Sequence, residues 1–379
     1  MMPPVIFWFD YPPKVEVGAF NAFTKLWNGI VYYAISNPHR SERVLANWGD
    51  EYGDVKIVKL YEKTDRAKAI ESLVQDHPDA IHVLNGFDTK ICKEIKPFLF
   101  KDGLKALLFT ERPAIFGNWG EALLRKVYTT VKYARLSREY SKYVRAILPL
   151  GKQGVHVFQK LGFPKDRMYD FMYCPSLTDL SNKKDIEVHS PIRFVYVGRF
   201  FYKTKGTDVL LDALPFLKGE WSLDLVGGYG ANREDVLNRI QGYKNVRFAG
   251  TWDSNSVVKN IQNYDVVLIP SKADGWNLLV NEAFHAGVGV IVSDQAVSHE
   301  VVENHGGGAV FKSQAPEQMA MAMQRVIDNP LVAMEWMRAS RENVQYISKE
   351  TVGQYLYGIV RYEFFQAEEK PKCPWLLDL

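Results

Sequence analysis

The sequence contains few cysteines, and none of them is placed to hold a metal or to form a disulfide framework. Cys92, Cys174 and Cys373 are the three cysteines among 379 residues, and no two of them form a CxxC pair. This spacing argues against a zinc site and favours a reducing cytoplasm. No stretch of about 18 apolar residues is present, so no membrane-spanning helix is expected. The apolar N-terminal run 5–9 is too short for a signal peptide and has no basic flank.

Extremes of charge and the common nucleotide-binding motifs are missing as well. The net charge is +3 and the pI is near 8.5, which, without a recognition motif, argues against a nucleic-acid binder. Hydrophobic residues make up 47% of the chain, a proportion typical of a globular protein and not of a disordered one. No complete GxGxxG follows a strand and no GxxxxGK loop occurs. A dinucleotide-dependent dehydrogenase and a P-loop enzyme are therefore both disfavoured.

What the sequence does contain is a regular alternation of short β-branched or aromatic runs with helix-length segments. This alternation predicts βαβ units and a parallel sheet. In the first half, strands are expected at 5–9, 56–60, 80–84 and 105–109, with a helix at 66–75. In the second half, strands are expected at 193–198, 221–228, 245–250, 265–271 and 288–294, with helices at 207–217, 257–264, 277–287 and 316–327. A long aromatic helix is expected over 351–365, and the polar stretch 181–191 predicts a domain boundary.

The first candidate site is the strand-to-helix junction 197–208, because ligands bind beyond the carboxyl ends of parallel strands. Arg199 and Lys205 flank a loop that enters a helix there. Two cations beside a helix N-terminus suit a diphosphate. The alternative is that both residues are solvated loop charges.

The second candidate junction, 269–287, carries two carboxylates. Asp274 lies in the loop after a buried strand, and Glu282 follows in an apolar helix that is expected to open near Asn277. Carboxylates accept hydrogen bonds from sugar and ribose hydroxyls, and Gly275 allows the backbone to approach a ligand closely. The alternative, an N-capped core helix, does not explain a glutamate inside an apolar segment.

The third junction, 292–311, offers His299, Glu303 and His305, which are residue types found at metal sites. An HExxH motif needs a histidine at position 303, where this sequence has glutamate. Metal binding is therefore not expected here.

Positive charge is concentrated in the first half of the chain. Residues 1–180 hold 26 Lys and Arg against 20 Asp and Glu, whereas the remainder is net acidic. Within the first half, the segment 118–154 carries eight Lys or Arg, two Glu and several interleaved aromatics. Such a segment suits an anionic lipid surface or a phosphate-linked acceptor. A solvated basic helix face is the alternative.

The second-half junctions, taken in order, carry a family resemblance. The matching pieces are GRFFYKTKG (198–206), LVGGYG (225–230), VRFAGTW (246–252), YDVVLIPSKADGWNLLVNEAFHAG (264–287), VIVSD (290–294) and HEVVENHGGGAV (299–310). In order and spacing they resemble family 4 of the retaining glycosyltransferases, also called glycosyl transferases group 1. The first half of the chain resembles this family in layout only.

The resemblance implies the GT-B fold, an α/β architecture of two Rossmann-like, doubly wound domains that face each other across a cleft. It places an acceptor-side domain at 1–185 and a nucleotide-sugar-binding domain at 186–350. The helix and tail at 351–379 are expected to cross back onto the N-terminal domain.

The resemblance also implies roles for individual residues. Arg199 and Lys205 are expected to hold the donor diphosphate, Glu282 the ribose hydroxyls, and Asp274 the transferred sugar. The further donor-binding residues are expected to be Gly198, Gly227, Thr251, Trp252, Gly275, Trp276, Asn277 and Leu278.

The chain departs from the family pattern at four places, one of which is the loop from Arg199 to Lys205, which is one residue longer than usual. Asp274 stands where the family usually has glutamate. On the acceptor side, Gly18 is alone where the family has a glycine pair, and Glu111 stands where many members have a histidine. The resemblance therefore supports the acceptor-side roles of Gly18 and Glu111 less strongly than the donor-side roles.

The function implied is that of a retaining, hexosyltransferase-type glycosyltransferase that needs no metal ion. Its donor is a nucleotide-sugar, with UDP expected first because it is common in the family, and its acceptor is a glycan, lipid-linked or other hydroxyl, as in polysaccharide biosynthesis. The segment 118–154 adds peripheral contact with the inner face of an anionic membrane, and no nucleic acid is expected. The alternatives are a nucleotide-sugar epimerase, a phosphorylase, or a sugar-nucleotide-binding scaffold without turnover.

Overall fold

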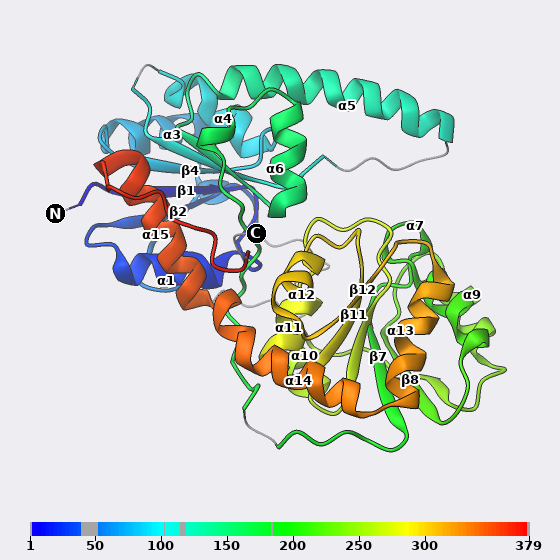
Figure 1. Cartoon of the computed structure of the whole chain (residues 1–379). Coiled ribbons are helices and arrows are strands. Elements are labelled where there is room, and N and C mark those ends of the chain that lie inside the picture. Colours follow the sequence, from blue (N-terminus) through cyan, green and yellow to red (C-terminus); the bar gives the residue numbers. More distant parts are fainter. Residues whose placement is uncertain (1, 39–51, 102, 114–118, 183–184, 377–379) are drawn as a thin grey trace. The chain divides into compact units, whose positions relative to one another are not determined.

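The chain folds into two compact units, each built on its own parallel sheet. The computed structural model describes residues 2–38, 52–101, 103–113, 119–182 and 185–376. The first unit consists of Met1–Ser176 with Lys349–Pro374, and the second of Leu177–Ser348 with Trp375–Leu379. In each unit, helices cover both faces of the sheet (Figure 1).

The first unit contains a six-stranded parallel sheet in the order β3-β2-β1-β4-β5-β6. Its strands are β1 (Val5–Phe9), β2 (Val31–Ile35), β3 (Lys56–Lys59), β4 (Ile81–Asn85), β5 (Ala106–Thr110) and β6 (Ala146–Pro149). Its helices are α1 (Val17–Leu26), α3 (Arg66–Gln75), α4 (Lys90–Leu99), α5 (Trp119–Tyr140), α6 (Gly151–Lys160) and α15 (Lys349–Phe365). Strand β1 is buried along its whole length because it packs on both faces: Ile6 and Trp8 join the core under α3 and α4, while Phe7 packs against Phe20 of α1.

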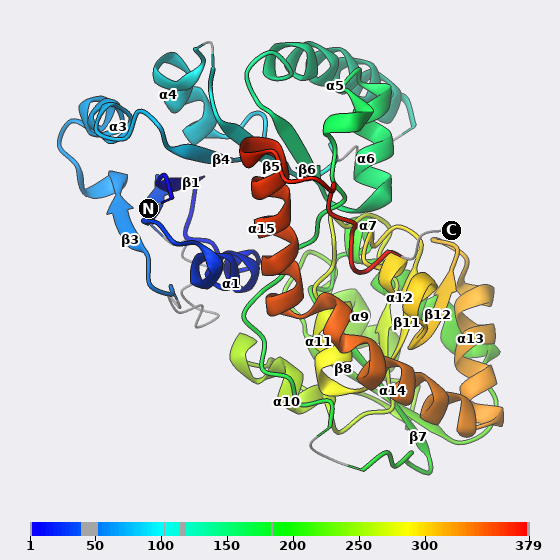
Figure 2. The ribbon, with the colours of Figure 1, turned by 60° about the vertical axis from the view of Figure 1, so that its left-hand side comes forward.

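Helix α15 belongs to the first unit although it comes near the end of the sequence, and it packs along α1 (Figure 2). A Cβ atom at Gly353 would lie 2.5 Å from Ala22 Cβ, so a glycine is needed for the two helices to approach this closely. Near the end of α15, Glu363 accepts hydrogen bonds from Arg145 Nε at 2.9 Å and from the Tyr169 hydroxyl at 2.5 Å. The expected return of the last helix to the N-terminal domain is confirmed.

The second unit contains another six-stranded parallel sheet, in the order β12-β11-β10-β7-β8-β9. Its strands are β7 (Ile192–Gly198), β8 (Trp221–Gly227), β9 (Val246–Phe248), β10 (Val266–Ile269), β11 (Gly289–Ser293) and β12 (Gly308–Phe311). Its helices are α7 (Tyr202–Lys205), α8 (Thr207–Ala213), α9 (Arg233–Ile240), α10 (Val257–Ile261), α11 (Leu279–Ala286), α12 (His299–His305), α13 (Pro316–Asp328) and α14 (Leu331–Asn343).

The two sheets share one topology. When each is numbered from its own first strand, the order is 3-2-1-4-5-6, the doubly wound Rossmann arrangement. The direction of winding reverses between β1 and β4 in the first unit and between β7 and β10 in the second. Ligands bind beyond the carboxyl ends of the strands at such a switch point. The prediction of two Rossmann-like, doubly wound domains is confirmed.

The sequence pattern misses three strands and shifts one helix start. Strands β2, β6 and β12 are not predicted, and β12 begins within a glycine run. Helix α11 begins at Leu279, two residues later than expected, because Asn277 takes a left-handed backbone conformation with φ 77°.

Candidate functional site

The loops that follow β7 and β10 are joined at the switch point of the second sheet. The two strands are neighbours, so their carboxyl ends lie side by side. The amide of Lys272 donates to the carbonyl oxygen of Thr204 at 2.8 Å and links the two loops directly. A Cβ at Gly206, where φ is 64°, would lie 1.9 Å from the Pro270 carbonyl oxygen. Glycine is therefore required where the loops cross.

Lys205 and Asp274 meet across these two loops. Lys205 Nζ lies 2.5 Å from Asp274 Oδ2, and both side chains are largely buried. The same carboxylate oxygen accepts from Asn277 Nδ2 at 3.0 Å, and the Ser271 hydroxyl lies 3.4 Å away. The structure thus brings together one cation and one carboxylate that the sequence singles out, in a fixed polar cluster.

The residues that follow Asp274 form a rigid turn into α11. Trp276 is buried and its Nε1 donates to Asn281 Oδ1 at 2.8 Å. Asn277 Oδ1 accepts from the Leu279 amide at 3.1 Å, and the Ser298 hydroxyl donates to the Asn277 carbonyl at 3.0 Å. The expected donor-binding stretch 275–278 is therefore a loop before the helix and not the helix itself.

Glu282 lies in the first turn of α11, nearer to the start of the helix than expected. Its side chain is half-buried. Because α11 follows β10 directly, Glu282 stands at the same edge of the sheet as Asp274. The later helix start explains the shift.

Arg199 follows the last residue of β7, and its side chain is exposed. Its backbone is held in place by Tyr196, whose buried hydroxyl donates to the Arg199 carbonyl oxygen at 2.8 Å. Burial raises the pKa of Tyr196 well above its usual range, and the Asp274 carboxylate adds to this rise while Arg199 opposes it. The charges of Asp274 and Arg199 therefore both act on the Tyr196 hydroxyl near the end of β7.

The ends of β8 and β9 carry the remaining candidate residues. Gly198 and Gly227 are paired across β7 and β8, and a Cβ at Gly227, where φ is 107°, would lie 2.4 Å from the Gly198 carbonyl oxygen. The Gly227 amide donates to the Gly250 carbonyl at 2.8 Å, directly before Thr251 and Trp252. These residues thus lie at or beyond the carboxyl ends of β7, β8 and β9.

Sequence reasoning missed an ion pair beside this site. Lys272 Nζ lies 2.5 Å from Asp208 Oδ2, and both side chains are largely buried. Lys272 sits in the loop after β10 and Asp208 at the start of α8, so the pair fastens one side of the switch point to the other. The two residues lie in segments that the sequence already singles out, but no spacing rule pairs residues so far apart.

The acceptor-side candidates lie in the first unit. Gly18 is buried in the first turn of α1, where a Cβ would lie 2.3 Å from the Pro175 carbonyl oxygen. Glu111 follows β5, and its exposed carboxylate accepts a hydrogen bond from the Tyr173 hydroxyl. Close packing alone accounts for a glycine at position 18. A role for either residue toward an acceptor stays a prediction.

The described residues contain no group of three or more His, Cys, Asp or Glu side chains arranged to hold a metal ion. His299 Nε2 lies 3.5 Å from Glu303 Oε2, while His305 stacks on Tyr346 with ring centroids 4.4 Å apart. His299 also places its Nδ1 2.9 Å from the Ala296 carbonyl oxygen. The third junction therefore holds paired and stacked side chains.

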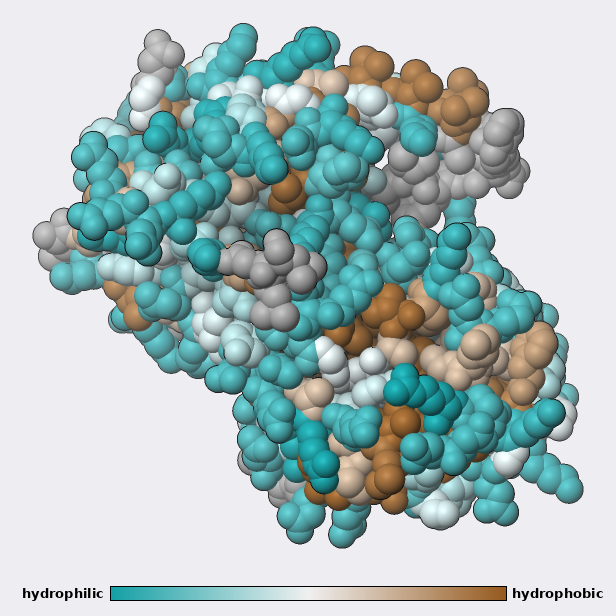
Figure 3. All heavy atoms as spheres, in the orientation of Figure 1, coloured by the Kyte–Doolittle hydropathy of each residue, from teal (hydrophilic) through white to brown (hydrophobic). Residues whose placement is uncertain are grey.

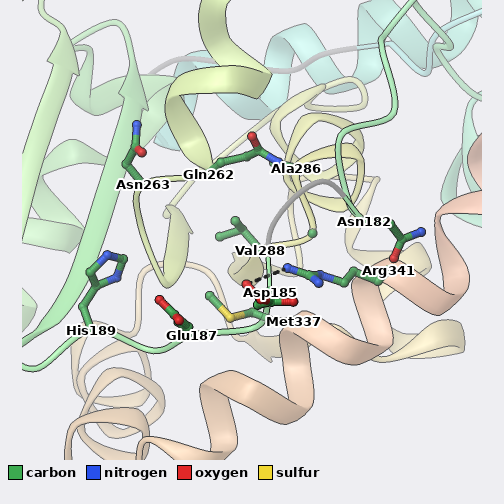
Figure 4. Close-up of a pocket in the computed structure, with 11 residues that line it drawn as sticks. Asn182, Asp185, Glu187, His189, Gln262, Asn263, Ala286, Val288, Met337 and Arg341 are labelled. Atoms are coloured by element: carbon green, nitrogen blue, oxygen red, sulfur yellow. Dashed lines mark hydrogen bonds between the residues drawn. The ribbon is translucent and has the colours of Figure 1, made fainter.

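A polar hollow of about 490 Å³ lies at the opposite edge of the second sheet (Figure 4). His189, Gln262 and Val288 line it just before β7, β10 and β11 begin. Arg341 reaches into it and donates to the Asp185 carbonyl oxygen at 3.4 Å. Parallel sheets bind ligands at the carboxyl ends of their strands. The hollow is therefore not the site assembled by Lys205 and Asp274.

The fold is that of solved GT-B glycosyltransferases. The structure of Anabaena Alr3699/HepE in complex with UDP matches with a TM-score of 0.69 at 13% identity, and the match covers 94% of this chain and 98% of that one. The same Anabaena protein in complex with UDP-glucose matches with a TM-score of 0.67 at 12% identity, over 96% of this chain and 99% of that one. At this identity the likeness shows the fold alone.

One segment of the sequence matches a family model. Residues 191–329 match the model of the family described as Glycosyl transferases group 1. The resemblance carried by the motifs of this segment is therefore confirmed.

Curated relatives match this chain over part of their length. The chain is 27% identical over 171 residues to the uncharacterized glycosyltransferase MJ1607 of Methanocaldococcus jannaschii, covering 42% of this chain and 44% of the relative. It is 25% identical over 159 residues to a glycogen synthase of Mycobacterium tuberculosis, covering 41% and 38%. The chain thus spans less than half the length of these relatives.

Proposed function

We propose that this protein is a retaining glycosyltransferase that moves a sugar from a nucleotide-sugar, UDP-linked in the first instance, to a hydroxyl acceptor. The observation that carries the proposal is the meeting of Lys205 and Asp274 at the switch point of a sheet whose segment matches the Glycosyl transferases group 1 model. A cation and a carboxylate held together at this edge can grip the phosphate and the sugar of one donor.

The donor diphosphate is assigned to Arg199 and Lys205. Breaking the sugar–phosphate bond builds negative charge on the leaving diphosphate, and cations already in place stabilise that charge. Lys205 is held by Asp274 before the donor arrives, so its ammonium group is ordered and close to the strand ends. In this proposal the two side chains supply the positive charge, and no metal ion is required.

The other contacts follow the order of the strands along the sheet edge. Glu282 binds the ribose hydroxyls, Asp274 and the backbone of 275–278 bind the transferred sugar, and the base lies near Gly227, Thr251 and Trp252. The HepE structures with UDP and with UDP-glucose support a UDP-sugar donor for this fold.

The transfer step retains the anomeric configuration. The bond between the sugar and the leaving phosphate breaks, and the acceptor oxygen forms its bond to the same face of the sugar. The acceptor proton passes to the leaving phosphate oxygen, so no covalent intermediate on the protein is needed. The glycogen synthase relative is consistent with a sugar hydroxyl as the acceptor, and a glycan, a lipid-linked sugar or another hydroxyl all present this group. Gly18 and Glu111 are the proposed acceptor-side residues.

The proposed location is the cytoplasm, with peripheral contact to the anionic inner face of the membrane through 118–154. Cys92 and Cys174 are buried free thiols, which suits a reducing compartment. Among the helices of the described residues, none combines the length and apolarity needed to cross a bilayer.

The proposal is tested by comparing Lys205→Ala with Lys203→Ala. The two lysines lie in the same short helix, but Lys203 is exposed. Loss of Lys205 is expected to slow sugar transfer by about 100-fold, since one stabilising group contributes roughly 3 kcal/mol. It is also expected to abolish most of the thermal stabilisation by UDP, whereas Lys203→Ala behaves as the unaltered protein. Near-normal transfer by Lys205→Ala contradicts the assignment, and release of free sugar isomer in place of a glycoside identifies an epimerase.

A further inference from the structure

Helix α5 exposes a row of large apolar side chains. The row consists of Leu123, Leu124, Val127, Tyr128 and Val131, whose exposed fractions lie between 53% and 74%. We call it the α5 apolar row. Hydrophobic surface gathers along this helix in the space-filling view (Figure 3). Five exposed apolar side chains within three turns form a contiguous patch, which in soluble proteins marks an interaction surface.

The α5 apolar row occupies one side of a helical segment whose other side is exposed as well. At about 100° per residue, its five positions occupy an arc of about 140° on the helix. The buried side chains of α5, Ser137 and Tyr140, lie outside this arc and in the last turns of the helix, and the Tyr140 hydroxyl donates to the Phe87 carbonyl oxygen at 2.9 Å. The helix is therefore anchored near its C-terminal end, and the turns that carry the row are uncovered within its unit.

Positive charge continues the same outward face. Arg135 and Arg138 follow the row on this side and are exposed. Arg125 and Lys126 lie within the row's turns and are exposed as well. Lys132, by contrast, forms an ion pair with Asp88. The outward face of α5 is thus apolar in its first described half and basic in its second.

We propose that α5 lies in the headgroup region of an anionic bilayer, with the α5 apolar row inserted and Arg135 and Arg138 on lipid phosphates. This deepens the membrane contact of the proposed function by naming insertion, and not charge alone, as its basis. An apolar face flanked by cations is typical of a helix that lies in the membrane interface. A second copy of this chain is the alternative occupant, but the exposed cations that follow the row favour anionic headgroups.

Vesicle co-sedimentation of the full chain tests the insertion. The row variant is Leu123→Ser with Leu124→Ser, and the matched control is Met321→Ser with Leu331→Ser, which are exposed by 71% and 59% in the second unit. The unaltered protein and the control are expected to bind phosphatidylglycerol vesicles. Each leucine lost from the row is expected to weaken binding by about tenfold. Arg135→Gln with Arg138→Gln is expected to weaken binding by about fivefold per arginine at low salt, with little further effect at high salt.

Two results overturn the inference. The first is a row variant that binds these vesicles as tightly as the control. The second is a protein that ignores vesicles but dimerises in solution through the row, as sedimentation velocity of the row variant would reveal. Thermal stabilisation by UDP is measured on the same samples and is expected to be unchanged in the row variant. Failure of vesicle binding therefore remains distinct from failure of the proposed donor site.

Discussion

Lys205 Nζ lies 2.5 Å from Asp274 Oδ2, although the two residues are 69 positions apart in the sequence. They meet because β7 and β10 are parallel neighbours at the point where the winding of the sheet reverses. The ion pair gives Lys205 a partner that an incoming diphosphate must replace. Asp274 is thus a competitor of the donor phosphate and, in the proposed function, a ligand of the donor sugar.

Because Asp274 is proposed to compete with the phosphate and to bind the sugar, we expect Asp274→Asn to change UDP binding and sugar transfer in different ways. Removing the charge frees Lys205, so UDP alone is expected to bind at least as tightly as to the unaltered protein. Sugar transfer is expected to fall by about 10- to 100-fold, since a hydrogen bond to a charged group contributes about 1.5–3 kcal/mol. Calorimetric titration with UDP and a transfer assay measure the two effects separately. If Asp274→Asn weakens UDP binding as strongly as Lys205→Ala does, the carboxylate does not compete with the phosphate.

The pair of Lys272 and Asp208 is expected to stabilise the same two loops. Lys272→Met or Asp208→Asn should lower the free energy of unfolding by about 1 kcal/mol and raise the KM for the donor, because the pair is mostly shielded from water. The exposed pair of Arg239 and Asp212 is a matched control, and breaking it should cost less than about 0.5 kcal/mol. Urea unfolding of the single and double variants gives the coupling. If the losses in the two single variants simply add up in the double variant, the ion pair itself contributes nothing to the free energy of unfolding.

Gly227 is expected to tolerate no side chain. In Gly227→Ala the new Cβ meets the Gly198 carbonyl oxygen at 2.4 Å, with φ at 107°. We expect a loss of about 1–3 kcal/mol in the free energy of unfolding and weaker UDP binding. Gly242→Ala is the control, because a Cβ there has nothing within 4 Å and φ is not left-handed. Equal thermal stability of the two variants contradicts this account of the β7–β8 edge.

The core of the first unit carries a pH-sensitive group. Burial, assisted by the nearby His77 charge, lowers the pKa of His82 from 6.5 to about 3, and its neutral Nδ1 accepts from Trp8 Nε1 at 3.1 Å. Below pH 6.5 the unfolded chain binds a proton here that the folded chain does not. The free energy of unfolding is therefore expected to fall by up to about 1.4 kcal/mol per pH unit between pH 6.5 and 3.

His82→Asn is expected to flatten this dependence, and His156→Asn to leave it unchanged because His156 is exposed. Urea unfolding at a series of pH values measures both slopes. A His82→Asn variant that keeps the slope of the unaltered protein shows that other groups set the acid response.

Motif spacing predicted the second unit well because its chemistry lies in short contiguous stretches. The strand ends at Gly198 and Gly227 and the loop around Asp274 can all be read from neighbouring residues. The left-handed backbone of Asn277 cannot, since it depends on the hydrogen bond from the Ser298 hydroxyl, 21 residues away. The same limit hides the contact of Lys272 with Asp208, because only the folded sheet brings them together.

The first unit was harder to predict. Its strands β2 and β6 have no flanking motif. For α5 the sequence shows interleaved cations and aromatics, but an apolar stripe on a helix normally faces the core. Only the structure shows that Leu124 and Val127 point outward while Tyr140 packs inward.

The most direct test of the central claim is a crystal structure of the full chain with bound UDP. The account predicts the diphosphate beside Arg199 and Lys205, Lys205 Nζ released from Asp274, and the ribose hydroxyls on Glu282. UDP bound elsewhere, for example in the polar hollow at the amino ends of β7 and β10, with the Lys205–Asp274 pair intact, would contradict it.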